Sequence, residues 1–152
     1  MTIFLASDHA GFELKEIIKK FLLTKNQYTV EDVGTFSNER VNWVEYGAKA
    51  AKKVSQNCNQ ARGILVCGSG IGMSIVSNKF KNIRAALCSD EYAAEMSRKH
   101  NNANILNLGG RVLNPETAIK IVEKWLTTGF EAGRHQQRLD YLVSNIEKIN
   151  FK

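Results

Sequence analysis

Short apolar runs and stretches of helical periodicity follow one another along the whole chain. The first apolar run covers residues 2–7, and from Gly11 apolar residues recur with the spacing of an amphipathic helix. The expected strands cover residues 2–7, 28–33, 63–67, 83–88 and 104–108. The expected helices are one from Gly11, one over 42–54, one that ends at Lys79, one opened by Ser89 or Asp90, one capped by Asn114 with Pro115 at its first position, and a last one over 135–149.

This regular alternation predicts a parallel sheet covered on both faces, because right-handed crossovers place the connecting helices there. The run Gly63-Ile-Leu-Val-Cys67 is apolar throughout, which favours a strand at the centre of the sheet. No linker or repeat interrupts the pattern. We predict a single domain over 1–152 of the α/β class, doubly wound and Rossmann- or flavodoxin-like, with a five-stranded parallel sheet and a C-terminal helix.

A fold of this kind also predicts where a ligand binds. Ligands of open α/β sheets lie beyond the carboxyl ends of the strands. The segments expected at that edge are Ser7-Asp8-His9, Cys67 to Gly72, Ser89-Asp90 and Gly109-Gly110-Arg111.

Composition and charge narrow the classes of partner. With 43% hydrophobic and 24% charged residues, the chain has the composition of a globular protein, and no apolar run is long enough to cross a membrane. The net charge of +6 fits a small anionic substrate, whereas the lysines are scattered as on solvated helix faces and no nucleic-acid motif accompanies them. The first residues lack the features of a signal peptide. We expect a cytoplasmic protein with neither nucleic acid nor membrane as a partner.

The segment Gly68-Ser-Gly-Ile-Gly72 lies at a strand-to-helix turn, where glycines leave backbone N–H groups free to hold an anion or a developing oxyanion. A dinucleotide fingerprint or a merely tight turn is the alternative. Met73 stands where the fingerprint requires its last glycine, and the loop follows the third strand rather than the first.

Three cysteines, Cys58, Cys67 and Cys88, are widely spaced and odd in number, so the sequence suggests neither a disulfide framework nor a zinc site. Cys67 ends the apolar strand directly before the glycines, where a helix N-terminus would stabilise a thiolate. A buried core cysteine is the equally weighted alternative, and it is the expectation for Cys88. We expect Cys58 at the surface.

Other candidates are less specific by themselves. Asp8 and His9 form an acid and imidazole pair, although such a pair also serves as a helix cap. His100 lies near the end of a helix, where the dipole alone could explain it. Arg134 and Arg138 are four residues apart on one helix face, a spacing that fits a phosphate group as well as a solvated surface.

Several motifs occur in order along nearly the whole chain: Ser7-Asp-His-Ala-Gly-Phe12, Gly34-Thr-Phe-Ser37, Gly63-Ile-Leu-Val-Cys-Gly-Ser-Gly-Ile-Gly-Met-Ser74, Asn78-Lys-Phe80, Ile83-Arg-Ala85, Ser97-Arg-Lys-His-Asn101 and Gly133-Arg-His-Gln-Gln-Arg138. Together they closely resemble the family of ribose-5-phosphate isomerase B and the related galactose-6-phosphate isomerase subunits. An ordered set of this length is far more specific than a glycine motif.

The resemblance implies catalytic roles. Cys67 would be the base that moves a proton between C2 and C1 of the open-chain sugar, while the amides of Gly68, Gly70, Ile71 and Gly72 stabilise the enediolate. One branch of the family has a glutamate base in this loop, but here that position is Ile71, so the cysteine route is implied. His100, assisted by Ser69 and Asp8, would open the furanose ring. Many members have threonine at the position of Ser69, and the hydroxyl is common to both.

The resemblance also implies the binding groups and the assembly. Phosphate would be held by His9, Arg134 and Arg138, and further substrate contacts would come from Asn101 and Arg111. No metal or organic cofactor is implied. A homodimer, alone or paired into a tetramer, would complete each site with residues of both subunits.

Two alternatives to a ribose 5-phosphate isomerase remain at this point. One is an isomerase of a six-carbon sugar phosphate such as allose or galactose 6-phosphate. The galactose enzymes divide their catalytic groups between two different chains, whereas this chain contains Cys67, His100 and both C-terminal arginines. The other is a non-catalytic module that binds a sugar phosphate or nucleotide, which would have no use for a reactive Cys67.

Overall fold

Five parallel strands form the centre of the molecule in this computed structural model, which describes residues 1–147. The strands are β1 (Thr2–Ser7), β2 (Thr29–Asp32), β3 (Ala61–Cys67), β4 (Ala85–Leu87) and β5 (Ile105–Gly109). Their order in the sheet is β2-β1-β3-β5-β4, so β3 is central, as its unbroken apolar sequence predicts. The predicted α/β class and five-stranded parallel sheet are confirmed.

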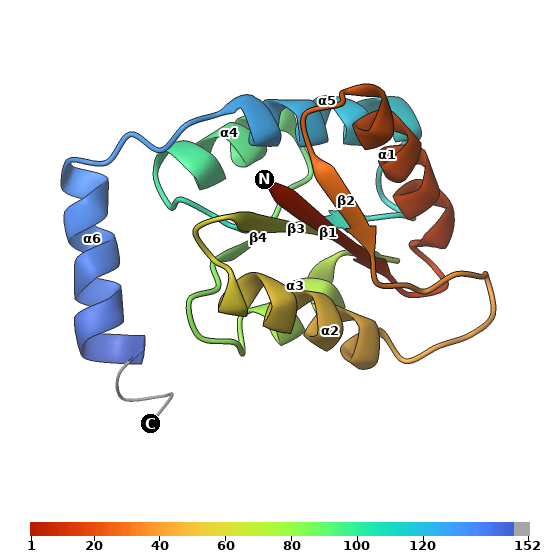
Figure 1. Cartoon of the computed structure of the whole chain (residues 1–152), viewed down its shortest axis with the longest axis horizontal. Helices are drawn as coiled ribbons and strands as arrows, with labels where there is room; N and C mark the ends of the chain where they lie inside the picture. Colours follow the sequence, from red (N-terminus) through yellow and green to blue (C-terminus); the bar gives the residue numbers. More distant parts are fainter. Residues whose placement is uncertain (148–152) are drawn as a thin grey trace.

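Helices cover both faces of this sheet (Figure 1). They are α1 (Phe12–Thr24), α2 (Trp43–Gln56), α3 (Ile71–Ser77), α4 (Glu91–Lys99), α5 (Pro115–Thr127) and α6 (Arg134–Leu142), followed by a π-helical turn η1 (Val143–Glu147). Helices α1, α4 and α5 enclose one hydrophobic core and α2 and α3 the other. The side chains of Asp90 and Asn114 accept N–H groups of the first turns of α4 and α5, as expected of helix caps.

The sheet differs from that of flavodoxin in the position of its fifth strand. Flavodoxin has the order 2-1-3-4-5, whereas β5 here lies between β3 and β4. Every residue of β5 is buried, while β4 is partly exposed and has three residues, fewer than the six predicted over 83–88. A short, partly exposed strand suits the edge of a sheet, and a fully buried strand suits its interior.

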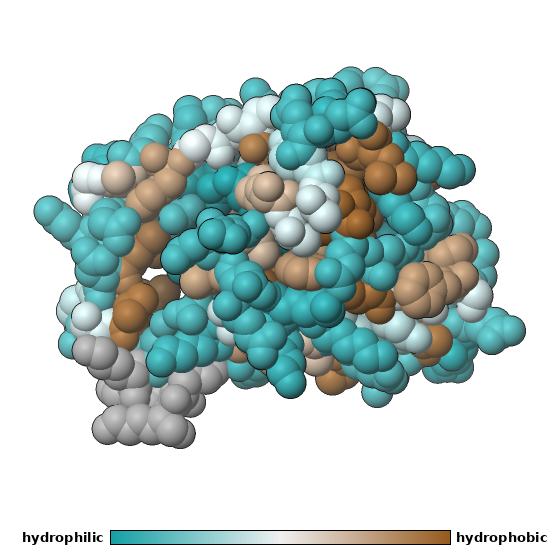
Figure 2. All heavy atoms as spheres, viewed as in Figure 1, coloured by the Kyte–Doolittle hydropathy of each residue, from teal (hydrophilic) through white to brown (hydrophobic). Residues whose placement is uncertain are grey.

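The C-terminal helix stands apart from the body of the molecule (Figure 1). The α-helix ends earlier than predicted, at Leu142, and η1 begins at Val143. Residues 148 and 149 of the predicted helix lie outside the described residues. A groove of about 850 Å³ separates α6 from the body and is lined on its apolar part by Phe80, Ile83, Leu139, Leu142 and Ile146. Hydrophobic side chains border the hollow beside this helix in Figure 2.

Among residues 1–147, no helix combines the length and the hydrophobicity that crossing a bilayer demands.

Candidate functional site

A cleft of about 470 Å³ opens at the carboxyl edge of the sheet. It is formed where β1, β3 and β5 end and where α2 and α3 begin. Its lining residues are Asp8, His9, Ala10, Trp43, Cys67, Gly68, Ser69, Gly72, Arg111 and Val112. The cleft is therefore at the edge that the topology predicts.

Cys67 is the last residue of β3 and is 5% exposed. Its Sγ accepts a hydrogen bond from the Gly70 N–H at 3.1 Å, a contact that becomes stronger when the sulfur carries negative charge. Gly70 has a φ of +78°, and a Cβ at this position would lie 2.4 Å from the Leu87 side chain. Only glycine fits, so the loop holds a backbone donor against the thiol.

Asp8 and His9 follow β1 and lie beside Cys67 in the cleft. The Asp8 Oδ1 atom accepts the N–H groups of Ala10 and Gly11 at 2.9 and 3.0 Å, which orients the buried carboxylate. The His9 Nδ1 atom accepts the Val41 N–H at 3.3 Å. In this arrangement Nε2 carries the ring proton and is the atom that can donate to an anion.

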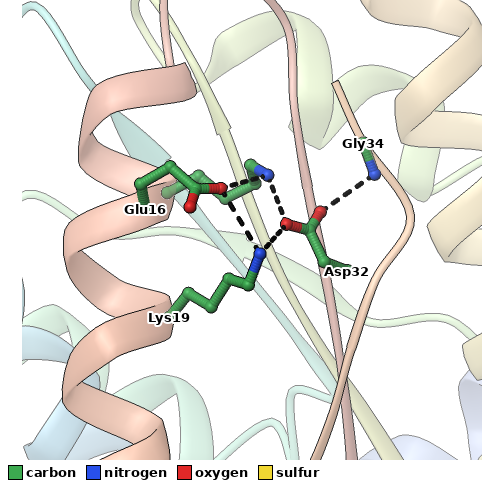
Figure 3. Close-up of polar contacts among 5 residues, drawn as sticks. Glu16, Lys19, Asp32 and Gly34 are labelled. Carbon is green, nitrogen blue, oxygen red and sulfur yellow. Dashed lines mark hydrogen bonds and ion pairs between the residues drawn. The ribbon is translucent and has the colours of Figure 1, made fainter. Parts of the chain in front are cut away.

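A network of charged side chains supports the strand end that precedes Asp8 (Figure 3). Asp32 Oδ2 accepts hydrogen bonds from Lys15 Nζ at 2.6 Å and Lys19 Nζ at 2.8 Å, and Asp32 Oδ1 accepts the Gly34 N–H at 3.0 Å. The Gly34 carbonyl in turn accepts the Ser7 N–H at 2.7 Å. The network thus connects α1 with the loop that fixes the end of β1.

Burial alone would raise the pKa of Asp32, but the hydrogen bonds from Lys15, Lys19 and Gly34 outweigh it and hold the pKa below its ordinary value. Lys15 is fully buried. Substituting Asp32→Asn should lower the free energy of unfolding at pH 7 by about 3 kcal/mol, because it removes the main counter-charge of a buried ammonium group. Urea unfolding of the two proteins, followed by circular dichroism, measures the difference.

The sign of the pH dependence follows from the lowered pKa. The ionised Asp32 stabilises the folded state above its unfolded pKa of about 3.9, and this contribution is lost as the pH falls through the lower pKa of the folded state. The difference in the free energy of unfolding between wild type and Asp32→Asn should therefore shrink below about pH 4. The control is Glu116→Gln, which breaks the exposed pair with Lys120 and should leave unfolding essentially unchanged. A difference that persists undiminished in acid would contradict this role of Asp32.

The structure divides the predicted site residues, apart from Gly70 and Ile71, into two groups. The group in the cleft consists of Asp8, His9, Cys67, Gly68, Ser69, Gly72 and Arg111. Gly70 and Ile71 belong to the same loop but do not line the cleft: the Gly70 N–H is bonded to Cys67 Sγ and the Ile71 N–H to Ser69 Oγ at 3.3 Å.

The second group is His100, Asn101, Arg134 and Arg138, none of which lines the cleft. Helix α4 begins after the carboxyl end of β4 and returns to the start of β5. His100, which caps the C-terminus of α4, therefore lies toward the amino ends of the strands, away from the cleft. Asn101 lines the groove beside α6, and both arginines are exposed on α6 itself. One chain alone does not bring the two groups together.

His100 stacks on His135, with ring centroids 4.2 Å apart and planes inclined by 12°. The Nε2 atoms of His100 and His135 lie 3.9 and 3.7 Å from Glu131 Oε2. Burial, reinforced by the charges of His100, Arg134 and Arg138, lowers the pKa of His135, so this ring favours its neutral form. These three residues could hold a metal ion by proximity, since their ligand atoms lie within 4.8 Å of one another. However, the in-plane lone pairs of two parallel rings do not converge on one point, as a metal centre requires.

Sequence reasoning missed Trp43, which lines the cleft from the first position of α2. A Cβ at Gly72 would lie 3.0 Å from the Trp43 ring, so the indole packs closely against the glycine loop. The start of a helix that follows a strand belongs to the carboxyl edge, so topology could have indicated this residue.

The cysteines behave differently from one another. All three are free. Cys88 is buried, as predicted, and burial raises its pKa to about 11, which makes it a poor source of thiolate. Cys58 is half-buried rather than fully at the surface.

A thiol, a carboxylate, an imidazole and a guanidinium thus meet beside a glycine loop at the carboxyl edge of a parallel sheet. These features define an α/β protein whose site suits proton transfer on a small anionic ligand.

Residues 3–142 match the model of the family described as Ribose/Galactose Isomerase. The chain is 41% identical over 143 residues to ribose-5-phosphate isomerase B of Escherichia coli (strain K12), an alignment that covers 94% of this chain and 95% of that protein. The chain belongs to the ribose/galactose isomerase family.

Solved structures agree with this assignment. Ribose-5-phosphate isomerase B of Clostridium thermocellum superposes with a TM-score of 0.92 at 46% identity, covering 98% of this chain and 99% of that chain. The enzyme of Mycoplasma genitalium, solved with bound ribulose 5-phosphate, superposes with a TM-score of 0.90 at 40% identity over 93% of each chain.

Proposed function

We propose that this protein is an aldose-ketose isomerase that interconverts ribose 5-phosphate and ribulose 5-phosphate. The observation that carries the proposal is the cleft, which places the thiol of Cys67 beside Asp8 and the glycine loop. The relatives named above are ribose-5-phosphate isomerases B, and one of them was solved with ribulose 5-phosphate bound.

In the proposed reaction, the Cys67 thiolate takes the proton from C2 of the open-chain aldose. The electron pair of that C–H bond forms the C1–C2 double bond of an enediolate, and the C1 carbonyl oxygen becomes negatively charged. Backbone N–H groups of the loop that contains Gly68 and Gly72, which line the cleft, would stabilise this charge. The hydroxyl proton of O2 then moves to O1, the O2 electron pair forms the C2 carbonyl, and the electron pair of the C1–C2 double bond takes the proton back from the thiol at C1, which gives the ketose and restores the thiolate. No step of this route calls for a metal or organic cofactor.

The remaining roles belong to groups of two chains in this proposal. His9 and Arg111 in the cleft contact the sugar phosphate, and Ser69 assists ring opening. The other groups are supplied by a second copy: His100 opens the furanose, Asn101 adds a substrate contact, and Arg134 and Arg138 hold the phosphate. Their position away from the cleft of their own chain supports a homodimer, and a tetramer would be a pair of such dimers.

The apolar groove beside α6 also supports a second copy. Leu142 and Ile146 are 38% and 46% exposed and face this groove together with Phe80. Exposed apolar side chains on a helix that stands apart from its own body are typical of a subunit interface.

The direct test of the function is the formation of ribulose 5-phosphate from ribose 5-phosphate by the purified protein in the presence of a metal chelator. Allose 6-phosphate, assayed in parallel, tests the six-carbon alternative. Absence of turnover with ribose 5-phosphate would overturn the proposal.

Shared sites predict complementation between two inactive variants. A heterodimer of one Cys67→Ala chain and one His100→Ala chain contains one site with both substitutions and one site with neither. If subunits exchange at random, half of the dimers are mixed, and about a quarter of the wild-type activity should return. Activity is measured after the two proteins are unfolded together and refolded.

Each variant refolded alone is the control. Activity of the mixture that equals the mean of the two controls would show that each site lies within one chain.

A further inference from the structure

Three arginines line a second pocket, of about 280 Å³, at the edge of the sheet opposite the cleft. The residues around it are Met1, Cys58, Asn59, Ala61, Arg62, Asn82, Arg84, Arg98, Asn102 and Asn104. Arg62 is the second residue of β3, Arg84 directly precedes β4, and Arg98 lies in the last turn of α4. Because these positions mark the amino ends of strands and the end of a helix, the pocket is separate from the substrate cleft.

No acidic side chain is found in the lining among the residues that the structure describes. Among residues 1–147, no carboxylate forms an ion pair with Arg62, Arg84 or Arg98. Glu147 is near enough to act on the charge of Arg84, but it lines the groove beside α6 and accepts the Asn82 N–H at 3.2 Å. Within residues 1–147, the three positive charges therefore share the pocket without a carboxylate paired to any of them.

The hydrogen-bond partners of these arginines are neutral. Arg62 donates to the Leu126 carbonyl at 3.3 Å, and Arg84 donates to the Asn102 carbonyl at 3.1 Å. Arg98 donates to Asn102 Oδ1 at 2.9 Å and to the Ala103 carbonyl. Carbonyl groups satisfy part of the guanidinium donors but leave the net charge in place.

Arg98 shows most clearly that the three arginines lack a negatively charged partner among the described residues. It is 5% exposed, and its buried Nε has no hydrogen-bond partner in the described part of the chain. Burial, with the charges of Arg62 and Arg84, lowers the pKa of Arg98 to about 10. Such a group lacks a negatively charged partner that would favour its ionised form.

A purely structural role explains only part of this arrangement. Arg62 and Arg98 pack against the Trp125 ring, with guanidinium carbons 5.3 and 5.6 Å from the ring centroid. Stacking accounts for the position of these two side chains. It accounts neither for Arg84 nor for an open pocket that three cations and several amide groups share.

We propose that this pocket is a binding site for a small, multiply charged oxyanion of the phosphate class. Guanidinium groups present forked donors that match the oxygen atoms of phosphate, and three of them around one pocket can contact such an ion from different sides. The volume of about 280 Å³ suits a phosphate or diphosphate group. The site is distinct from the one proposed to hold the phosphate of the sugar.

The test is isothermal titration of the full-length protein with inorganic pyrophosphate, in a chelator and at constant ionic strength. The parent protein carries Arg134→Gln and Arg138→Gln, which removes the arginines proposed for substrate phosphate. We expect the parent to bind one pyrophosphate per chain. Adding Arg62→Gln should weaken binding about ten-fold or more, because a charge-assisted pair is lost.

Lys20→Gln in the same parent is the matched control, since it removes one positive charge from an exposed position outside the pocket. It should change the dissociation constant less than about two-fold at constant ionic strength. If Arg62→Gln fails to fold, as circular dichroism would reveal, Arg84→Gln provides the same measurement. No binding by the parent, or equal weakening by the Lys20 and pocket variants, would overturn the proposal.

Discussion

Substituting Cys67→Ala should lower kcat/KM for ribose 5-phosphate about 10³-fold, because it removes the base that transfers the proton. In the cleft, Cys67 ends a buried strand and its sulfur faces the Gly70 N–H, so the position is fixed before substrate binds. Alanine is smaller and apolar, and the strand retains its backbone pairing with β1 and β5. The loss should therefore appear in activity while the circular dichroism spectrum is unchanged.

Cys88→Ala provides the matched control for this experiment. Both cysteines are buried, but Cys88 does not line the cleft and its pKa is raised to about 11 by burial. We expect its variant to keep nearly full kcat/KM. A Cys67→Ala protein with more than about a tenth of wild-type activity, or an equal loss in the two variants, would rule out Cys67 as the base.

Much of the fold could be predicted because the signals are local. The apolar run that ends at Cys67 identified the central strand, and Asp90 and Asn114 marked helix starts through their capping side chains. The order of the last two strands was not predictable in this way. It depends on which strand is buried on both faces, and the patterns of β4 and β5 are too short to decide it.

The part of the site that could be predicted consists of residues at or just after the carboxyl ends of strands. Asp8, Cys67 and Arg111 were placed at one edge by topology, and the structure brings them into one cleft. The separation of His100 from them depends on the path of α4, which only the three-dimensional structure reveals. Trp43 was missed because an aromatic residue at the start of a helix is equally typical of the hydrophobic core.

No sequence signal connected the three arginines of the pocket, although Arg84 and Arg98 lie in two of the motifs that carry the family resemblance. Arg62, Arg84 and Arg98 are separated by 22 and 14 residues and belong to three different elements, so no motif connects them. Their unpaired charge became apparent only when the neighbours of each guanidinium were known.

Substituting His100→Ala should separate ring opening from proton transfer. Ribose 5-phosphate is mainly a closed furanose, whereas ribulose 5-phosphate has no free hydroxyl that could close a five-membered ring and is an open chain. If His100 acts only on the ring, its variant should convert ribose 5-phosphate about 10²-fold more slowly or worse. The same variant should still remove and return the C1 proton of ribulose 5-phosphate, because that step requires Cys67 and no ring opening.

Proton NMR in D2O measures deuterium incorporation at C1 of ribulose 5-phosphate. A separate assay measures the turnover of ribose 5-phosphate. For His100→Ala, the exchange rate should change less than about three-fold, while Cys67→Ala should lose exchange and turnover together about 10²–10⁴-fold. His100 stacks on the buried His135 outside the cleft of its own chain, so the thiol and its loop are expected to remain intact in the variant. Equal loss of both reactions in His100→Ala would place this imidazole in the proton transfer itself, and loss of neither would exclude it from catalysis.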